Sequence, residues 1–145
     1  MSKTNAWETA LLQLLFENTN AANIGDATGL RGSTTAGSFY FSLHTADPGE
    51  AGDQTTSEIA YTSYARVAVA RSTAGFTVTA DAVATDANVD FPAGTGGTGT
   101  ATHFGIGTAS SGAGVLLYKC TITPNIVCGN GVTPRLNAGT VVTEA

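Results

Sequence analysis

The sequence has little charge, little cysteine and no long apolar run. Only 12 % of its 145 residues are charged, and its net charge is −5. Nucleic-acid binding needs clustered basic side chains, but the six Lys and Arg are scattered between Lys3 and Arg135. No apolar run approaches the roughly 18 residues of a membrane span, and Met1–Thr4 lacks the apolar block of a signal peptide. We therefore expect no nucleic-acid or membrane partner, and folding in a cytoplasm.

The two cysteines, Cys120 and Cys128, are too few for a disulfide scaffold. Their spacing matches neither a zinc ribbon nor a redox pair with two intervening residues. A short turn centred on Pro124 would place them opposite one another on neighbouring strands. A reducing cytoplasm favours free thiols, and a bond between them stays the alternative.

Large apolar residues are also scarce. Leu, Ile, Val and Phe make up roughly a fifth of the chain, close to the level below which order becomes doubtful. The length suits one domain, and we expect a single domain over residues 1–145. A chain with so few charged side chains has little to keep a large surface soluble as a monomer, whereas association would bury part of that surface. The composition therefore indicates a protein that assembles with other subunits.

One amphipathic helix is predicted over residues 4–18, with Thr4 as its N-cap. Its apolar stripe at helical spacing consists of Trp7, Ala10, Leu11, Leu14 and Leu15. Leu12 and Phe16 lie on a neighbouring face, so the apolar surface is wider than one core contact requires. The helix either packs across a sheet or docks on a partner subunit. The candidate partner-interface residues are Trp7, Leu11, Leu12, Leu15 and Phe16.

Residues 19–37 have the composition of a loop, and residues 38–145 read as successive strands. Alternation predicts strands at 39–44, 64–72, 76–80, 83–91, 101–107 and 115–123, and the turn Asn130-Gly131 predicts a type I′ hairpin. In the turn Asp47-Pro48-Gly49, Asp should close a local side-chain bond and Gly should take a positive φ. The fold class is mainly β, an antiparallel β-sandwich or jelly-roll-like barrel with one N-terminal amphipathic helix.

No motif in the chain has the spacing that catalysis or cofactor binding requires. The glycine run Gly94–Gly99 matches a dinucleotide fingerprint, but a strand rather than a helix follows it. His44, His103 and the serines of Ser110-Ser111-Gly112 lack a nucleophile elbow. Asp81, Asp86 and Asp90 lack the spacing of a calcium loop. We expect no catalytic residue, no cofactor and no metal.

Several segments resemble a family of small tailed-bacteriophage virion proteins, described as tail fibre-like or minor structural proteins. The similar segments are Leu11-Leu12, Ser42–Glu50, Tyr64-Ala65-Arg66, Phe91-Pro92, His103–Ile106 with the preceding Thr102, and Leu116-Leu117-Tyr118. The resemblance implies a virion part without enzymatic activity, made in the cytoplasm of the host bacterium.

Two virion roles follow as expectations. The main one is a capsid decoration or cement protein on the capsid surface, a homo-oligomer with a trimer as the favoured form. It would bind the major capsid protein and stabilise the assembled shell by mass action. The alternative is a tail fibre or tail-tip component, including host-receptor binding. A glycan-binding surface would need exposed aromatic side chains, for which the tyrosine candidates are Tyr40, Tyr61, Tyr64 and Tyr118.

Overall fold

The computed structural model describes residues 3–25 and 29–143. The described chain falls into two compact units. The helix unit contains the residues up to Ser38, Ala70–Asn88, and the residues from Asn137 onward. The sheet unit contains Phe39–Val69 and Val89–Leu136. That the whole chain folds as one domain stays a prediction.

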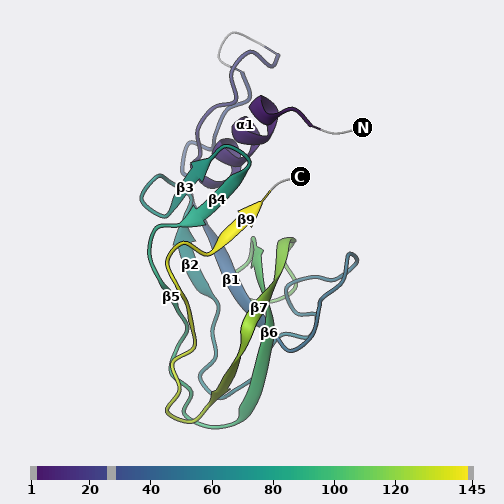
Figure 1. The fold of residues 1–145 in the computed structure, drawn as a ribbon, viewed down its shortest axis with the longest axis vertical. Helices are drawn as coiled ribbons and strands as arrows, with labels where there is room; N and C mark the ends of the chain where they lie inside the picture. Colours follow the sequence, from purple (N-terminus) through teal and green to yellow (C-terminus); the bar gives the residue numbers. More distant parts are fainter. Residues whose placement is uncertain (1–2, 26–28, 144–145) are drawn as a thin grey trace. The chain divides into compact units, whose positions relative to one another are not determined.

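The elements are mainly short antiparallel strands (Figure 1). They are α1 (Asn5–Phe16), β1 (Ser38–His44), β2 (Val67–Ala70), β3 (Phe76–Thr79), β4 (Ala82–Thr85), β5 (Val89–Asp90), β6 (Thr98–Gly107), β7 (Leu116–Gly129), β8 (Arg135–Leu136) and β9 (Val141–Thr143). The mainly β fold with an N-terminal helix is confirmed. The sheets have the strand orders β2-β1-β6-β7, β3-β4-β9 and β5-β8, and none of them closes on itself.

In the helix unit, α1 packs against β3 and β4 (Figure 1). Thr4 is the N-cap residue, as predicted, although its side chain makes no capping bond. The fully buried line of the helix is Glu8, Leu12 and Phe16, rather than the predicted stripe, whose members are half-buried. Phe16 meets Phe76 of β3 edge-to-face at 5.0 Å between ring centroids. The face of α1 that carries Glu8, Leu12 and Phe16 therefore packs into the core of the helix unit. Residues four apart lie on the same side of a helix, so this line of side chains can contact a sheet along the length of α1.

Side-chain hydrogen bonds satisfy backbone groups at the edges of the helix unit. The Glu17 carboxylate accepts a hydrogen bond from Val78 N at 2.8 Å, which satisfies part of the outer edge of β3. Arg71 donates to the carbonyl oxygens of Leu15 (2.6 Å), Leu14 (3.0 Å) and Ala36 (2.9 Å). A guanidinium at a helix C-terminus complements both the unpaired carbonyls and the helix dipole.

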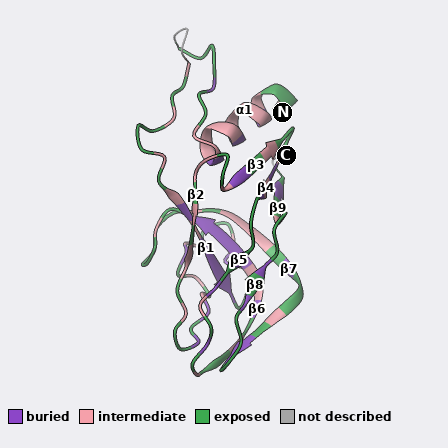
Figure 2. Ribbon diagram, turned by 90° about the vertical axis from the view of Figure 1, so that its left-hand side faces the viewer, coloured by how far each residue is buried: buried purple, intermediate pink, exposed green. Residues whose placement is uncertain are grey.

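In the sheet unit, β1 and β6 are the inner strands of the four-stranded sheet. Their register pairs Phe41 with Ile106 and Leu43 with Phe104, so these four side chains share one face. The Phe41 and Phe104 rings stack at 6.0 Å. Figure 2 shows β1 as largely buried, in agreement with its burial pattern. The alternation predicted from the sequence for this strand is confirmed.

Three local predictions differ from the structure. The predicted strand 83–91 is interrupted after Thr85, because residues 86–88 form a bend between β4 and β5. The predicted turn at Pro124 is wrong, because β7 continues from Leu116 to Gly129 through a cis Thr123–Pro124 bond. Cys120 lies opposite Phe104 and Cys128 opposite Gly99, and both thiols are free.

The turn at Asn130-Gly131 also differs from its prediction. Val132 N donates to Gly129 O, which closes the turn, but of its two central residues only Gly131 has a positive φ (+76°). That is the pattern of a type II turn rather than type I′. The turn leads toward β8, which pairs with β5. Across residues 3–25 and 29–143, no helix is long and apolar enough to cross a membrane.

Candidate functional site

A buried polar layer covers the second face of the main sheet. Alternation along β1 turns Ser42 and His44 away from the aromatic core, yet both are fully buried. The cover is the segment 45–61, which returns to β1: Ile59 N donates to Leu43 O at 2.9 Å, and Thr45 N, directly after the strand, donates to Ser57 O. The segment 45–61 therefore shields from solvent a face of β1 that would otherwise be exposed.

His44 joins the strand to this cover. Its Nε2 lies 2.8 Å from Ser42 Oγ, and its Nδ1 lies 2.8 Å from the carbonyl oxygen of Thr56. Because a carbonyl only accepts, Nδ1 carries the proton and Ser42 donates to Nε2. Loss of hydration lowers the pKa of His44, and the bond to Thr56 opposes this effect. The ring is thus held as a neutral structural group.

Gln54 fills the same layer and is also fully buried. Its Oε1 accepts from Ala109 N at 2.9 Å, and its own backbone N–H donates to Ala113 O at 2.9 Å, which ties the β6–β7 loop to the cover. A Cβ at Gly107 would lie 2.2 Å from Gln54 Cδ. A Cβ at Gly105 would lie 2.8 Å from His44 Nε2. Glycine is therefore required at both positions for the layer to reach the backbone of β6.

A buried ion pair anchors the end of the cover. Arg66 binds the Glu58 carboxylate through two nitrogens, Nε and a terminal nitrogen, each at 2.7 Å. The side chains of Arg66 and Glu58 are 3 % and 17 % exposed. Tyr64 donates to Glu58 at 2.8 Å and accepts from Leu43 N at 3.0 Å. The bond to Glu58 raises the pKa of Arg66, and burial raises the pKa of Tyr64.

The outer part of the cover carries the Asp47 turn. Gly49 N donates to Asp47 Oδ1 at 2.8 Å and Gly49 has φ +74°, so both predictions for this turn are confirmed. Lys119 of β7 approaches the turn, with its Nζ 3.1 Å from Asp47 Oδ1 and 3.2 Å from Glu50 Oε1. The bonds from Gly49 and then Lys119 lower the pKa of Asp47, and the two carboxylates raise the pKa of Lys119.

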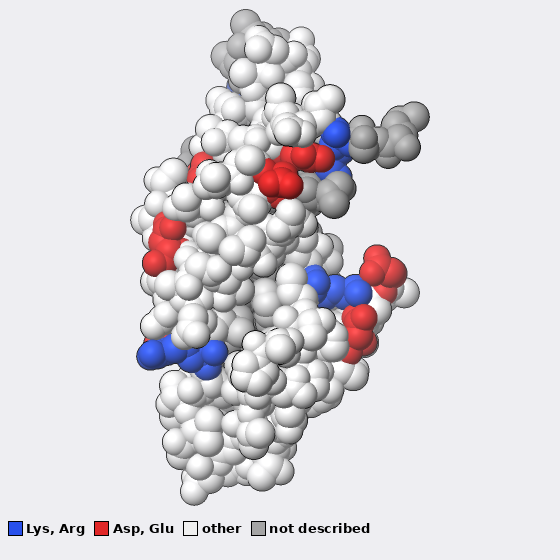
Figure 3. Space-filling model, viewed as in Figure 1, with Lys and Arg blue, Asp and Glu red and all other residues white. Residues whose placement is uncertain are grey.

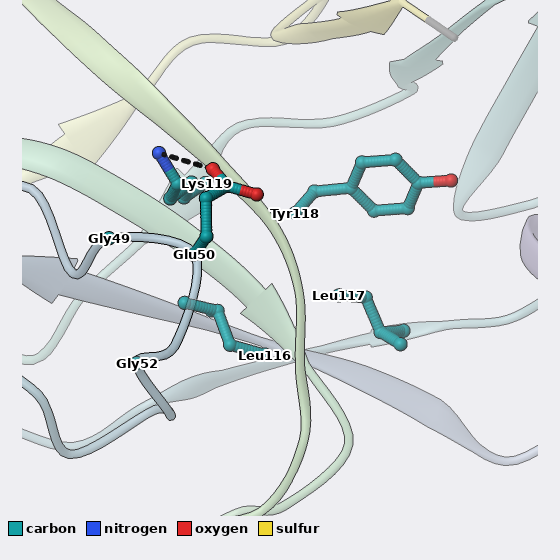
Figure 4. Close-up of a pocket in the computed structure, with 7 residues that line it drawn as sticks. All are labelled: Gly49, Glu50, Gly52, Leu116, Leu117, Tyr118 and Lys119. Atoms are coloured by element: carbon teal, nitrogen blue, oxygen red, sulfur yellow. Dashed lines mark ion pairs between the residues drawn. The ribbon is translucent and has the colours of Figure 1, made fainter.

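A surface pocket of about 280 Å³ lies between this turn and the start of β7 (Figure 4). We call it the loop–β7 pocket, and it is lined by Gly49, Glu50, Gly52, Leu116, Leu117, Tyr118 and Lys119. A β-bulge shifts the pairing so that Leu116 lies opposite Gly107 and Lys119 opposite Gly105. In Figure 4 Leu116 and Lys119 consequently extend toward the loop, while Leu117 and Tyr118 extend to the other side of β7.

The pocket combines an ammonium, a mostly exposed carboxylate and apolar carbons in a surface otherwise poor in charge. The Glu50 side chain is 93 % exposed. On the face drawn in Figure 3, charged side chains are few and most of the surface is uncharged. Such a mixture suits binding of a polar ligand through its hydroxyl or charged groups, with carbon contact to leucine. Among the described residues, no group of three or more His, Cys, Asp or Glu is placed to hold a metal ion.

The structure separates most of the candidates named from sequence. His44 and His103 lie opposite each other on β1 and β6, while the Ser110-Ser111-Gly112 run is exposed in the β6–β7 loop. His103 contacts Thr102 Oγ1 at 2.8 Å. Gly94–Gly99 leads into strand β6, not into a helix. Asp81, Asp86 and Asp90 are exposed, and Asp90 pairs with Arg135.

The tyrosine candidates divide between core and surface. Tyr61 is buried and donates to Pro92 O at 2.8 Å, and burial raises its pKa to about 12. Tyr64 stacks on Phe91 at 6.2 Å. Tyr40 is half-buried, and Tyr118 belongs to the lining of the pocket although its ring extends to the other side of β7. Two of the four tyrosine candidates for a glycan-binding surface, Tyr61 and Tyr64, therefore belong to the packed interior.

The candidate partner-interface residues all lie on α1 in the helix unit. Leu12 and Phe16 are fully buried within the chain, and Trp7, Leu11 and Leu15 are half-buried. Their role toward a partner stays a prediction. Sequence reasoning had no signal for the loop–β7 pocket, because its two walls are far apart in the chain. The resemblance did include both segments, Ser42–Glu50 and Leu116-Leu117-Tyr118.

Comparison with protein families assigns this β-rich chain to the structural proteins of phage virions. The model of a family described as podophage GP4 fiber I protein gp80 matches residues 2–144. The chain belongs to that family. No curated protein matches the chain.

Proposed function

We propose that the chain is a component of a phage fibre. The observation that carries this proposal is the family match over residues 2–144, whose description is that of a fiber protein. It supports the tail fibre alternative better than the main expectation of a capsid decoration protein bound to the major capsid protein. No enzymatic role is proposed, because Ser42 and His44, which are in hydrogen-bond contact, are both sealed inside the sheet unit.

Self-association into a homo-oligomer, with a trimer as the favoured form, is part of the proposal. Its support is the low charged fraction together with exposed apolar side chains in the sheet unit. These include Val115, 59 % exposed, and Val127, 68 % exposed. Association would remove such side chains from water, which is worth about 25 cal/mol per Å² of apolar surface.

The position of the chain in the virion tests the fibre assignment. Virions carrying a peptide tag on this chain would be labelled with a tag antibody and imaged by electron microscopy, and the copy number would be measured by quantitative mass spectrometry. Label at the tail with few copies is expected. Label spread over the shell, with a copy number that follows the major capsid protein, would restore capsid decoration.

Host-receptor contact is a second candidate function, favoured by the loop–β7 pocket. Purified protein should compete with phage for adsorption to host cells, and Lys119→Ala or Glu50→Ala should weaken the competition. Arg135→Ala is the matched control, since it removes another exposed ion pair outside the pocket. Equal competition by all variants would exclude the pocket from receptor contact.

A further inference from the structure

The chain has two histidines, so His103 can serve as a control for His44. His44 and His103 lie opposite each other in the β1–β6 register. His44 is fully buried beneath the segment 45–61, whereas His103 is only half-buried. The two rings therefore share a neighbourhood but differ in their access to water.

Both ring nitrogens of neutral His44 have well-matched hydrogen-bond partners, whereas protonation of the ring disturbs one of these bonds. In the neutral form Nδ1–H donates to Thr56 O and Nε2 accepts from Ser42, both at 2.8 Å. In the protonated form both nitrogens donate, so the Ser42 hydroxyl must turn its hydrogen elsewhere. The acceptor available to it is Gly105 O at 3.5 Å, which is long for an O–H···O bond.

The charged groups near His44 do not offset the loss of hydration that disfavours its protonated ring. The Glu58 carboxylate favours the charged ring, but it is already bound by Arg66 and Tyr64. The positive charges of Arg66 and of a protonated His103 disfavour it. Burial is the largest effect and lowers the pKa of His44 from its ordinary value of 6.5.

We propose that His44 is an acid-sensitive latch, which holds the segment 45–61 on β1 when neutral and releases it on taking up a proton. That segment contains Gly49, Glu50 and Gly52, so its release removes one wall of the loop–β7 pocket. The latch is a property of the isolated chain and stands whatever the pocket binds.

The sign of the effect follows from the direction of the pKa shift. An open, hydrated His44 takes up its proton near pH 6.5, whereas the closed one resists it to lower pH. The stabilisation of the closed latch is therefore complete well above pH 6.5 and decreases as the pH falls through that value. Between pH 7.5 and 5.5 the closed state should lose up to about tenfold in its equilibrium with the open state, the limit reached when only the open ring binds a proton.

Hydrogen exchange of the full chain at pH 7.5 and 5.5, corrected for the intrinsic exchange rate at each pH, tests the latch. The amides of Thr45 and Ile59, which donate to Ser57 O and Leu43 O, should lose protection by up to about tenfold. His44→Asn, which keeps a donor for Thr56, should abolish this loss, and His103→Asn should preserve it. An unchanged acid response in His44→Asn, or its disappearance in His103→Asn, would overturn the proposal.

An NMR titration of the wild-type histidine rings decides the matter if His44→Asn folds poorly. The His44 ring should take up its proton below pH 6.5, in step with the loss of protection in the segment 45–61. Protonation of His44 while that segment stays protected would contradict the latch.

Discussion

Two arginines stand at the two ends of β2, and each fixes one unit by different chemistry. Arg66, in the sheet unit, binds the Glu58 carboxylate through two nitrogens inside the protein. Arg71, in the helix unit, donates to three backbone carbonyl oxygens, two of them at the C-terminal end of α1. The first contact matches one charge with another, whereas the second satisfies neutral groups. The consequences of removing each arginine should therefore differ.

The largest expected effect is that of Arg66→Met. The substitution keeps an apolar stem but leaves the Glu58 carboxylate buried without its cation, which costs about 3 kcal/mol of unfolding free energy. Urea unfolding followed by fluorescence would measure it. The double variant Glu58→Gln with Arg66→Met should recover much of the loss, and failure to recover would show that packing rather than charge sets the cost.

Gly107→Ala should come next. The new Cβ would lie 2.2 Å from Gln54 Cδ, so the buried polar layer must move, at a cost of about 2 kcal/mol. Gly129→Ala in β7 is the control, because its Cβ would have its nearest contact at 3.4 Å. Thermal unfolding of the two variants should separate them, and equal melting temperatures would mean that the layer is not tightly packed.

Arg71→Met should cost less than Arg66→Met. Its carbonyl partners lose about 1–2 kcal/mol of hydrogen bonding in total, because they are neutral and water can replace part of what is lost. Arg71→Lys should retain part of that stability, since an ammonium can still reach a helix C-terminus. A loss as large as that of Arg66→Met, measured in the same urea series, would contradict the distinction between charged and neutral partners.

The smallest effect on stability is expected for Lys119→Ala. Its ion pairs with Asp47 and Glu50 lie at the surface, where screening by solvent leaves them little net contribution to stability. Unfolding should therefore be nearly unchanged, which allows a change in adsorption to be attributed to the pocket itself. A marked drop in melting temperature would instead give Lys119 a structural role.

The parts of the fold that the sequence predicts correctly are those set by residues close to one another along the chain. The alternation Phe39-Phe41-Leu43, the Asp47-Pro48-Gly49 turn and the helix at the N-terminus all follow from local patterns, and the structure confirms them. The burial of Ser42 and His44 could not be predicted, because alternation assigns them to the wet face. Only the return of the segment 45–61 over β1 buries them.

Long-range pairing explains the remaining differences. The residues around Pro124 predict a turn, but pairing with β6 keeps β7 extended on both sides of this proline, with a register shift between Ala101 and His103. Likewise Leu12 and Phe16 form the buried line of α1 because β3 and β4 lie beneath them. The pocket lies between residues 49–52 and 116–119, whose approach no local pattern encodes.

Hydrogen exchange of Arg66→Met and Arg71→Met, compared residue by residue with the wild type, tests most directly whether each arginine fixes its own unit. In Arg66→Met the amides of Ile59 and Ala109 in the sheet unit should lose protection first. In Arg71→Met the first loss should fall on the last turn of α1 and on Val78 in the helix unit. Equal loss of protection across both units in both variants would contradict the account.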